Sequence, residues 1–255
     1  MLDMKIPFTR YTGGVFVRKA LFTDFSVKLE GNFVRLAGSD SLTQDPSRRG
    51  RNLSFRTDLY EAALSVEYYF YQINDISRTS STRIDFKSYL FVGFGAAYFN
   101  PQGYHYGHEK WYDLRPLHTE GVDKAYDEIT MIIPYGAGVN FTFNKEFRVG
   151  LQIGYRNTFT DYLDDISTTY VSDDKLPQAT FELSKYFTDR ADAAYAREDF
   201  PHDRGHYGGD GAIRGNPDDN DGYLMVQLTL SYVMKGGDSF RRSRYNSIIN
   251  RRGRF

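Results

Sequence analysis

Three histidines and two glutamates gather in one polar stretch of the chain, YHYGHEKWYDLRPLHTEG. His105, His108, His118, Glu109 and Glu120 carry the imidazole and carboxylate groups that zinc takes as ligands. Their spacing, H-x-x-H-E, matches no zinc motif, and a loop lacks the helix that gives H-E-x-x-H its geometry. We therefore predict that these residues are solvated or pack within a loop, and we assign no metal site.

A second acidic stretch, GNPDDNDG, places Asp218, Asp219 and Asp221 close together, as in a calcium loop. The EF-hand order needs glycine at the sixth position, and counting from Asn216 places Asp221 there. The Asn-Pro and Asp-Gly pairs are typical of turns. We expect a turn that returns the chain to its last strand.

Two short G-x-G patterns, at Gly93 and Gly95 and at Gly136 and Gly138, resemble fragments of nucleotide-binding loops. They lie inside predicted strands with no helix after them, so the phosphate-binding geometry is missing and close packing or barrel curvature is expected instead. No Ser, His and Asp set follows a nucleophile motif. The sequence thus predicts no catalytic residue and no cofactor, and we expect a protein that is not an enzyme.

Composition favours an all-β protein. The 255 residues include 21 Tyr, 20 Phe and 23 Gly, and aromatic residues suit strands while glycine suits turns. The net charge of -1 gives no bias towards nucleic acid, and the absence of cysteine excludes thiol chemistry. No run of eighteen apolar residues is present, which excludes a membrane-spanning helix but leaves alternating membrane strands open.

Alternation of apolar and polar residues predicts seven strands. They cover residues 11 to 22, 25 to 37, 55 to 71, 84 to 99, 129 to 143, 147 to the loop that begins at Asp161, and 223 to 233. Charges share one face of these strands, namely Lys28, Glu30, Glu61, Glu67, Arg148 and Arg156, and would be costly in an apolar core unless paired. The fourth and fifth strands are apolar on both faces, so their inward sides stay unassigned.

The connections alternate between short and long, with long loops at about 38 to 54, 100 to 128 and 161 to 222. This asymmetry is typical of up-and-down barrels in outer membranes, which have short periplasmic turns and long external loops. We predict a polar lumen, an aliphatic face towards lipid, and aromatic girdles formed by Phe25, Tyr68, Phe70, Phe147, Tyr155 and Tyr232.

Two further segments lie outside the strands. Leu183, Phe187, Ala191, Ala194 and Tyr195 fall at helical spacing and predict a short external helix, whose apolar stripe packs on its own loops or binds a partner. We divide the chain into a barrel domain, 1 to 235, and a basic tail, 236 to 255, expected to be disordered and periplasmic. The tail arginines that could dock to an acidic partner or lipid headgroups are Arg241, Arg242, Arg244, Arg251, Arg252 and Arg254.

Five separated segments carry a family resemblance: RNLSFRTDLYEAALSVEYYF (51 to 70), FVGFGAAYFNPQ (91 to 102), WYDLRPLHTEG (111 to 121), GYRNTFTDYLDDISTTYV (154 to 171) and RGNPDDNDGYLMVQLTLSY (214 to 232). The chain resembles a Bacteroidetes family of OmpA-like outer-membrane barrels that includes the PorG-type component of the type IX secretion system. The resemblance implies a structural protein of the outer membrane that anchors periplasmic ring proteins of this secretion system.

The barrel of that family has eight strands, so the resemblance implies that a first strand and a signal peptide are missing here; MLDMKIPFTR has no apolar signal-peptide core. We expect that residues 1 to 255 alone do not insert stably, because seven strands leave edges unpaired in lipid. Two other functions stay open. One is an external adhesin or ligand-binding barrel, and the other is a lipid-modifying or proteolytic outer-membrane enzyme.

Overall fold

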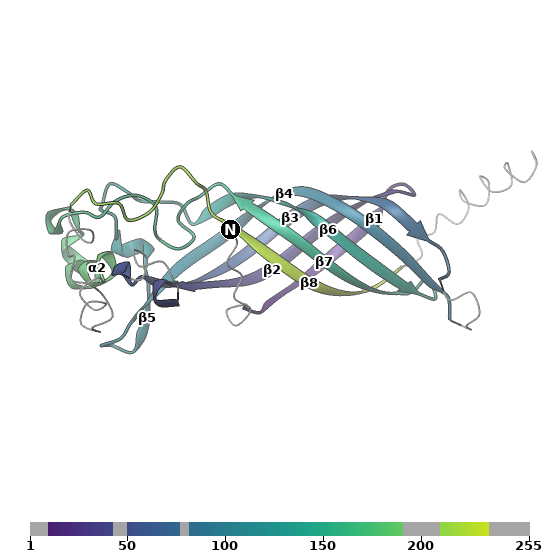
Figure 1. Cartoon of the computed structure of the whole chain (residues 1–255), viewed down its shortest axis with the longest axis horizontal. Coiled ribbons are helices and arrows are strands. Elements are labelled where there is room, and N and C mark those ends of the chain that lie inside the picture. Colours follow the sequence, from purple (N-terminus) through teal and green to yellow (C-terminus); the bar gives the residue numbers. More distant parts are fainter. Residues whose placement is uncertain (1–9, 43–49, 77–81, 191–209, 235–255) are drawn as a thin grey trace, which may run out of the picture.

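The computed structural model describes residues 10–42, 50–76, 82–190 and 210–234 and contains an antiparallel, up-and-down sheet that curls around its own interior (Figure 1). The strands are β1 (Thr12–Ala20), β2 (Phe25–Ser39), β3 (Ser54–Ile73), β4 (Ile84–His105), β5 (Lys110–Asp113), β6 (Ile129–Phe143), β7 (Phe147–Thr158) and β8 (Gly222–Tyr232). Consecutive long strands are neighbours, and β5 pairs with β4 alone. The predicted all-β architecture with seven long strands is confirmed.

The strand boundaries differ from the prediction mainly in β4. This strand continues past residue 99 to His105, because β5 pairs with it from Gln102 to His105. The first hairpin is also wider than the predicted two-residue turn, since residues 21–24 connect β1 to β2. Asn144 and Lys145 form the predicted turn before β7, and both adopt positive φ angles.

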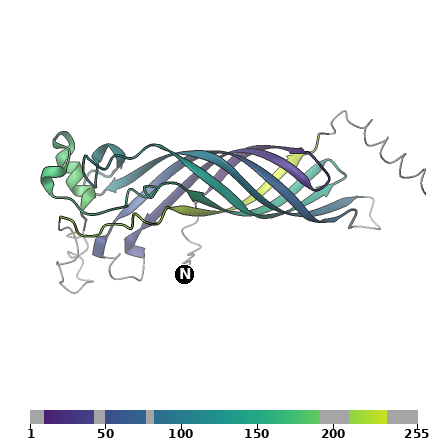
Figure 2. The ribbon, with the colours of Figure 1, turned by 90° about the horizontal axis from the view of Figure 1, so that it is seen from above.

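The two ends of the sheet differ. The connections at residues 21–24 and 144–146 are short and lie at one end of the sheet, which we call the turn end. The other end, which we call the loop end, carries α2 (Phe181–Thr188), β5 and the described parts of the long connections (Figures 1 and 2). The predicted helix in the last long connection is therefore confirmed. It ends at Thr188 because Asp189 is extended. Ala191, Ala194 and Tyr195, like the basic tail and its six arginines, lie outside the described residues.

The strand faces alternate as the sequence predicts. On β2, the inward Lys28 is 2% exposed, whereas its outward neighbour Leu29 is 56% exposed. Outward aliphatic residues on the other strands, including Leu64, Val66, Leu90, Val92, Leu151, Ile153, Leu228 and Leu230, are also exposed. The sheet therefore encloses charged side chains and presents aliphatic ones outwards.

Aromatic residues form two rows on this outer face. The turn-end row contains Phe25 beside Tyr68 and Phe147 beside Tyr232, with ring centroids 5.1 and 5.5 Å apart. The loop-end row contains Phe33, Tyr60 and Tyr98, with successive ring centroids 5.2 and 6.4 Å apart, and Tyr135 beside Tyr155, 5.9 Å apart. On β2, β3 and β7 the two rows are eight residues apart along the strand.

The inward faces of β4 and β6, which the sequence left unassigned, are now clear. Tyr89 and Phe91 point inwards from β4 and are buried. A Cβ at Gly138 would lie 2.4 Å from the Tyr89 ring, and one at Gly154 would lie 2.6 Å from the Phe91 ring. These glycines are needed because large aromatic side chains occupy the interior beside them. The packing interpretation of the glycines is confirmed.

In the described part of the chain, no ladder joins β1 to β8, so the barrel-like sheet is open between them. The two strands come close at Thr12, whose Oγ1 lies 3.9 Å from the Met225 sulfur. No helix within the described ranges is long and apolar enough to cross a membrane.

Candidate functional site at the loop end

The middle of the interior holds a network of buried charges. Lys28 Nζ lies 3.0 Å from Glu30 Oε2 and donates a 2.7 Å hydrogen bond to Gln152 Oε1. Arg156 NH2 lies 3.7 Å from Glu30 Oε1 and 3.6 Å from Glu61 Oε1. Each of these side chains is at most 3% exposed. Opposite charges must be brought together when they are buried in this way, because an unpaired buried charge is very costly.

A second charge pair lies nearer the turn end. Arg18 Nε is 2.8 Å from Glu67 Oε2, and Tyr69 donates a 2.7 Å hydrogen bond to the same carboxylate. Arg148 is half-buried and donates to Thr142 Oγ1 at 3.0 Å. The predicted location of the six strand charges inside the sheet is thus confirmed.

Towards the loop end the interior becomes apolar. The residues of this cluster are Val34, Leu59, Ala63, Ala97, Phe99, Ile132, Leu163, Tyr223 and Met225. Leu163 comes from the connection after β7, so this loop inserts an apolar side chain into the mouth of the sheet. Its backbone carbonyl accepts a 2.5 Å hydrogen bond from Thr57 of β3. Side chains from strands and loop together fill this end of the interior.

Above this cluster, the connection 106–128, which includes β5, and the described part of the connection 159–221, which includes α2, form a structure that we call the cap. Glu120 and Arg214 join its two long connections: Arg214 NH1 donates to Glu120 Oε1 at 2.9 Å, and both side chains are 2% exposed. Glu120 also accepts hydrogen bonds from the backbone amides of Ser167 and Thr168. A buried carboxylate with this many partners fixes the two connections to each other.

Several cap carboxyls have raised pKa values. Burial raises the pKa of Asp161 to about 7, with Asp221 and Glu120 adding to the effect. Burial raises the pKa of Asp165 to about 6, although Arg214 and hydrogen bonds from Thr119 and Tyr126 oppose that rise. Burial and Asp221 also raise the pKa of Asp164 well above its ordinary value. Desolvation favours the neutral carboxyl in each case.

The histidines and glutamates of the sequence motif do not converge on one metal-binding site in the described part of the chain. His105 stacks on His108 and on Tyr186 of α2, with ring centroids 3.9 Å apart in both pairs. His118 ends a short helical turn in a left-handed conformation, and Glu120 forms an ion pair with Arg214. Glu109 has a positive φ and lies in the exposed turn between β4 and β5. His105 thus contributes aromatic surface on which α2 packs, and His108 stacks on His105 and contacts Tyr112.

The acidic stretch before β8 forms the expected turn. Asn216 Nδ2 donates to Asp219 Oδ2 at 3.0 Å, and Asp218 is exposed. Asp221 Oδ2 accepts a hydrogen bond from the Leu163 amide at 2.9 Å. Among the described residues, no group of three or more His, Asp or Glu side chains is arranged to hold a metal ion.

The sequence did not reveal the Glu120–Arg214 pair, because 94 positions separate the two residues and each lies in a polar loop. Asp165 was missed for the same reason, although it receives hydrogen bonds from Thr119 and Tyr126 at 2.6 Å. Neither residue belongs to an alternating pattern. Only the folded cap brings them together.

A family model described as Domain of unknown function (DUF6089) matches residues 14–184, which run from within β1 through β7 to the first part of α2. No curated protein and no solved structure matches the chain.

Proposed function

The chain belongs to the family described as Domain of unknown function (DUF6089), and we propose that it is a non-enzymatic barrel protein of the bacterial outer membrane. One observation carries this proposal: an exposed aliphatic band lies between two aromatic rows on the outside of a sheet whose interior is charged. A water-soluble barrel has the opposite arrangement, with the apolar side chains inside.

The spacing of the two rows supports lipid as the environment of this band. Eight residues of strand span about 26 Å, and a tilt of about 40° reduces the height to about 20 Å between ring rows. With the rings included, this agrees with the apolar band of about 25 Å in outer-membrane barrels. Tyr and Phe side chains at its two borders are suited to the interface between lipid and water.

For the role of the barrel we propose anchoring within type IX protein secretion, as in PorG-like proteins. The family resemblance of the five sequence segments supports this role. The filled interior fits an anchor better than a channel, since Arg156, Glu67 and Gln152 are at most 1% exposed inside the sheet. Periplasmic ring proteins would then meet the turn end, and we propose the connection from Gln72 to Arg83 and the basic tail as their contacts.

Cell fractionation tests the membrane assignment. We expect the native protein in the outer-membrane fraction, resistant to extraction by urea and released by detergent. Recovery in a detergent-free soluble fraction would exclude the proposal. The secretion role has a separate test, because deleting the gene should reduce export of type IX cargo, and unchanged export would remove that role while leaving the barrel in place.

The cap supports a second candidate, a barrel that binds an external ligand. Its two long connections are locked by a buried ion pair, and a rigid external surface suits recognition. Deletion of residues 161 to 221 would then abolish binding and spare secretion. For the enzyme alternative, alanine substitution of His105, His108 and His118 is the test, and retention of any measured activity would argue against it.

A further inference from the structure

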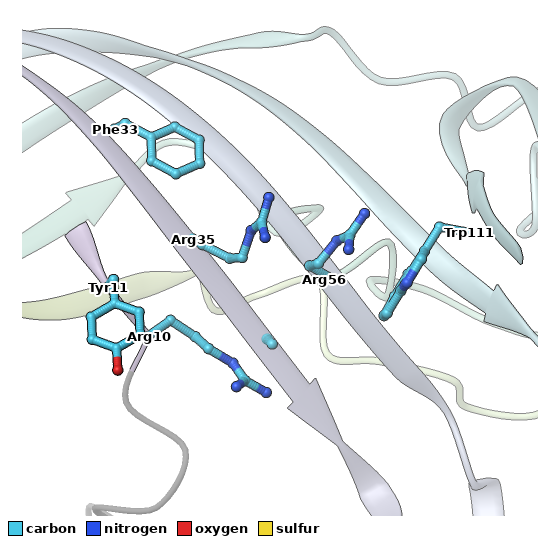
Figure 3. A pocket seen from close by; sticks show the side chains of 7 residues that line it. Arg10, Tyr11, Phe33, Arg35, Arg56 and Trp111 are labelled. Carbon is cyan, nitrogen blue, oxygen red and sulfur yellow. The ribbon is translucent and has the colours of Figure 1, made fainter. Parts of the chain in front are cut away.

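An arginine-rich hollow of about 450 Å³ lies on the outer wall, next to the loop-end aromatic row. It is lined by Arg10, Tyr11, Phe33, Arg35, Ala37, Arg56 and Trp111, which come from the two residues before β1 and from β2, β3 and β5 (Figure 3). A volume of this size is within the range of small-ligand sites.

The register of the sheet places this hollow just beyond the apolar band. Phe33 pairs with Tyr60 in the aromatic row, Arg35 pairs with Asp58 one step further out, and Ala37 pairs with Arg56 beyond them. Residues two apart on a strand share a face and are about 7 Å apart. If the rows mark the edge of a membrane, as proposed above, the arginines lie at the depth of lipid headgroups.

The three arginines have little internal compensation. Arg35 Nε and NH2 donate to the two oxygens of Asp58, at 2.5 and 2.7 Å. No acid in the described ranges forms an ion pair with Arg10 or Arg56. The lining of the hollow therefore contains three arginines and no acidic residue, and of the three only Arg35 has a carboxylate partner among the described residues. This excess favours an anion.

Arg56 provides the second observation. Its guanidinium lies over the Trp111 ring, 4.1 Å from the centroid, and its NH2 donates to Gln102 Oε1. Its Nε is buried and has no hydrogen-bond partner among the described residues. Stacking holds the guanidinium plane in place, and a buried donor without a partner is costly unless a ligand supplies an acceptor.

The geometry points to a binding site for the phosphate of a lipid headgroup, with Arg10, Arg35 and Arg56 as donors and the acyl chains lying along the aliphatic wall below Phe33. Guanidinium groups recognise phosphate through paired hydrogen bonds. A lipid rather than a free anion is favoured because Phe33 and the apolar band continue directly from the floor of the hollow. This inference rests on the proposed membrane location.

Native mass spectrometry of the full-length protein in nanodiscs tests the site. The probes are phosphatidic acid and the diacylglycerol with the same acyl chains, each in neutral phosphatidylcholine, because they differ only in the phosphate. We expect retention of phosphatidic acid over diacylglycerol, and retention reduced about tenfold or more in R10A/R56A. The matched control is K124A, which removes one exposed positive charge from the cap and should leave retention unchanged.

Equal retention of the two lipids, unchanged retention in R10A/R56A, or an equal loss in K124A would overturn the site. Displacement of phosphatidic acid by equimolar inorganic phosphate would also overturn it, since the site would then bind a free anion. The proposed function fails separately, through recovery of the protein in the soluble fraction. A protein that fractionates with the outer membrane but does not distinguish the two lipids would refute this inference alone.

Discussion

At the scale of single residues, the cap depends on the carboxylate of Glu120. It accepts hydrogen bonds from the amides of Ser167 and Thr168 and from Arg214, and the contacts with Ser167 and Arg214 are buried. A buried pair of this kind adds little net stability relative to an apolar pair, but loss of one partner leaves the other charge buried alone. We therefore expect the pair to hold the two connections in the arrangement of the structure.

The variant R214A should destabilise the cap by about 3 to 5 kcal/mol, because the buried Glu120 would lose its cation partner. Limited proteolysis of the folded protein, followed at the connections 106–128 and 159–221, measures the effect. The matched control is K175A, which breaks the exposed pair of Lys175 and Asp210 and should cost less than about 1 kcal/mol. Equal protease sensitivity of the two variants would contradict the role of the buried pair.

The cap should also lose stability as the pH rises. Asp161 has a pKa of about 7 in the folded protein against 3.8 in an unfolded chain, so the folded state binds more protons between these values. Its stabilising effect is complete below about pH 4 and disappears as the pH rises through about 7. Asp165, with a pKa of about 6, acts in the same direction.

Hydrogen exchange of cap amides, corrected for the intrinsic rate, should show greater protection at pH 5 than at pH 8. The variant D161N should weaken this dependence, since it removes the carboxyl that titrates near pH 7. Protection that increases with pH in the wild-type protein would contradict the raised pKa of Asp161.

At the scale of elements, alternation predicted the strands well wherever one face is polar. β2 and β7 carry Lys28, Glu30 and Arg156 on one side, so their inward faces could be assigned from the sequence. In β4 the inward face carries Tyr89 and Phe91 and the outward face carries aliphatic residues, so both appear apolar. Side-chain size, which decides how the interior is filled, is not recorded by an alternating pattern. β5 was missed because a strand of four residues is too short to alternate.

The variant G138A should therefore destabilise the sheet by about 1 to 3 kcal/mol, because its Cβ would lie 2.4 Å from the Tyr89 ring. To measure this change, samples in detergent are heated to increasing temperatures before electrophoresis, and the temperature at which the band of folded protein disappears is recorded. Gly13 provides the control, since a Cβ there meets nothing within 4 Å. A G138A protein as heat-resistant as G13A would show that Tyr89 moves without cost.

At the scale of the whole molecule, the two ends of the sheet have different tasks in the proposed function. The turn end has short connections, and the loop end has a cap fixed by buried contacts. The sequence predicted this asymmetry from loop lengths, and it predicted the barrel-like sheet from strand faces. The structure of the cap could not be predicted, because its contacts join loops that are distant in sequence, such as Thr119 with Asp165 and Arg214 with Glu120.

Single cysteines can determine the orientation of the molecule, because the native chain has none. We expect K124C, in the cap, to react in intact cells with a maleimide that does not cross the outer membrane. K145C, at the turn end, should react only after the outer membrane is permeabilised, and V92C, in the outward aliphatic band, should react only after detergent is added.

Labelling of K145C before K124C would reverse the orientation. Rapid labelling of V92C in intact cells would place water rather than lipid against the aliphatic wall, and an outer face that is apolar between two aromatic rows would then need a protein partner to cover it.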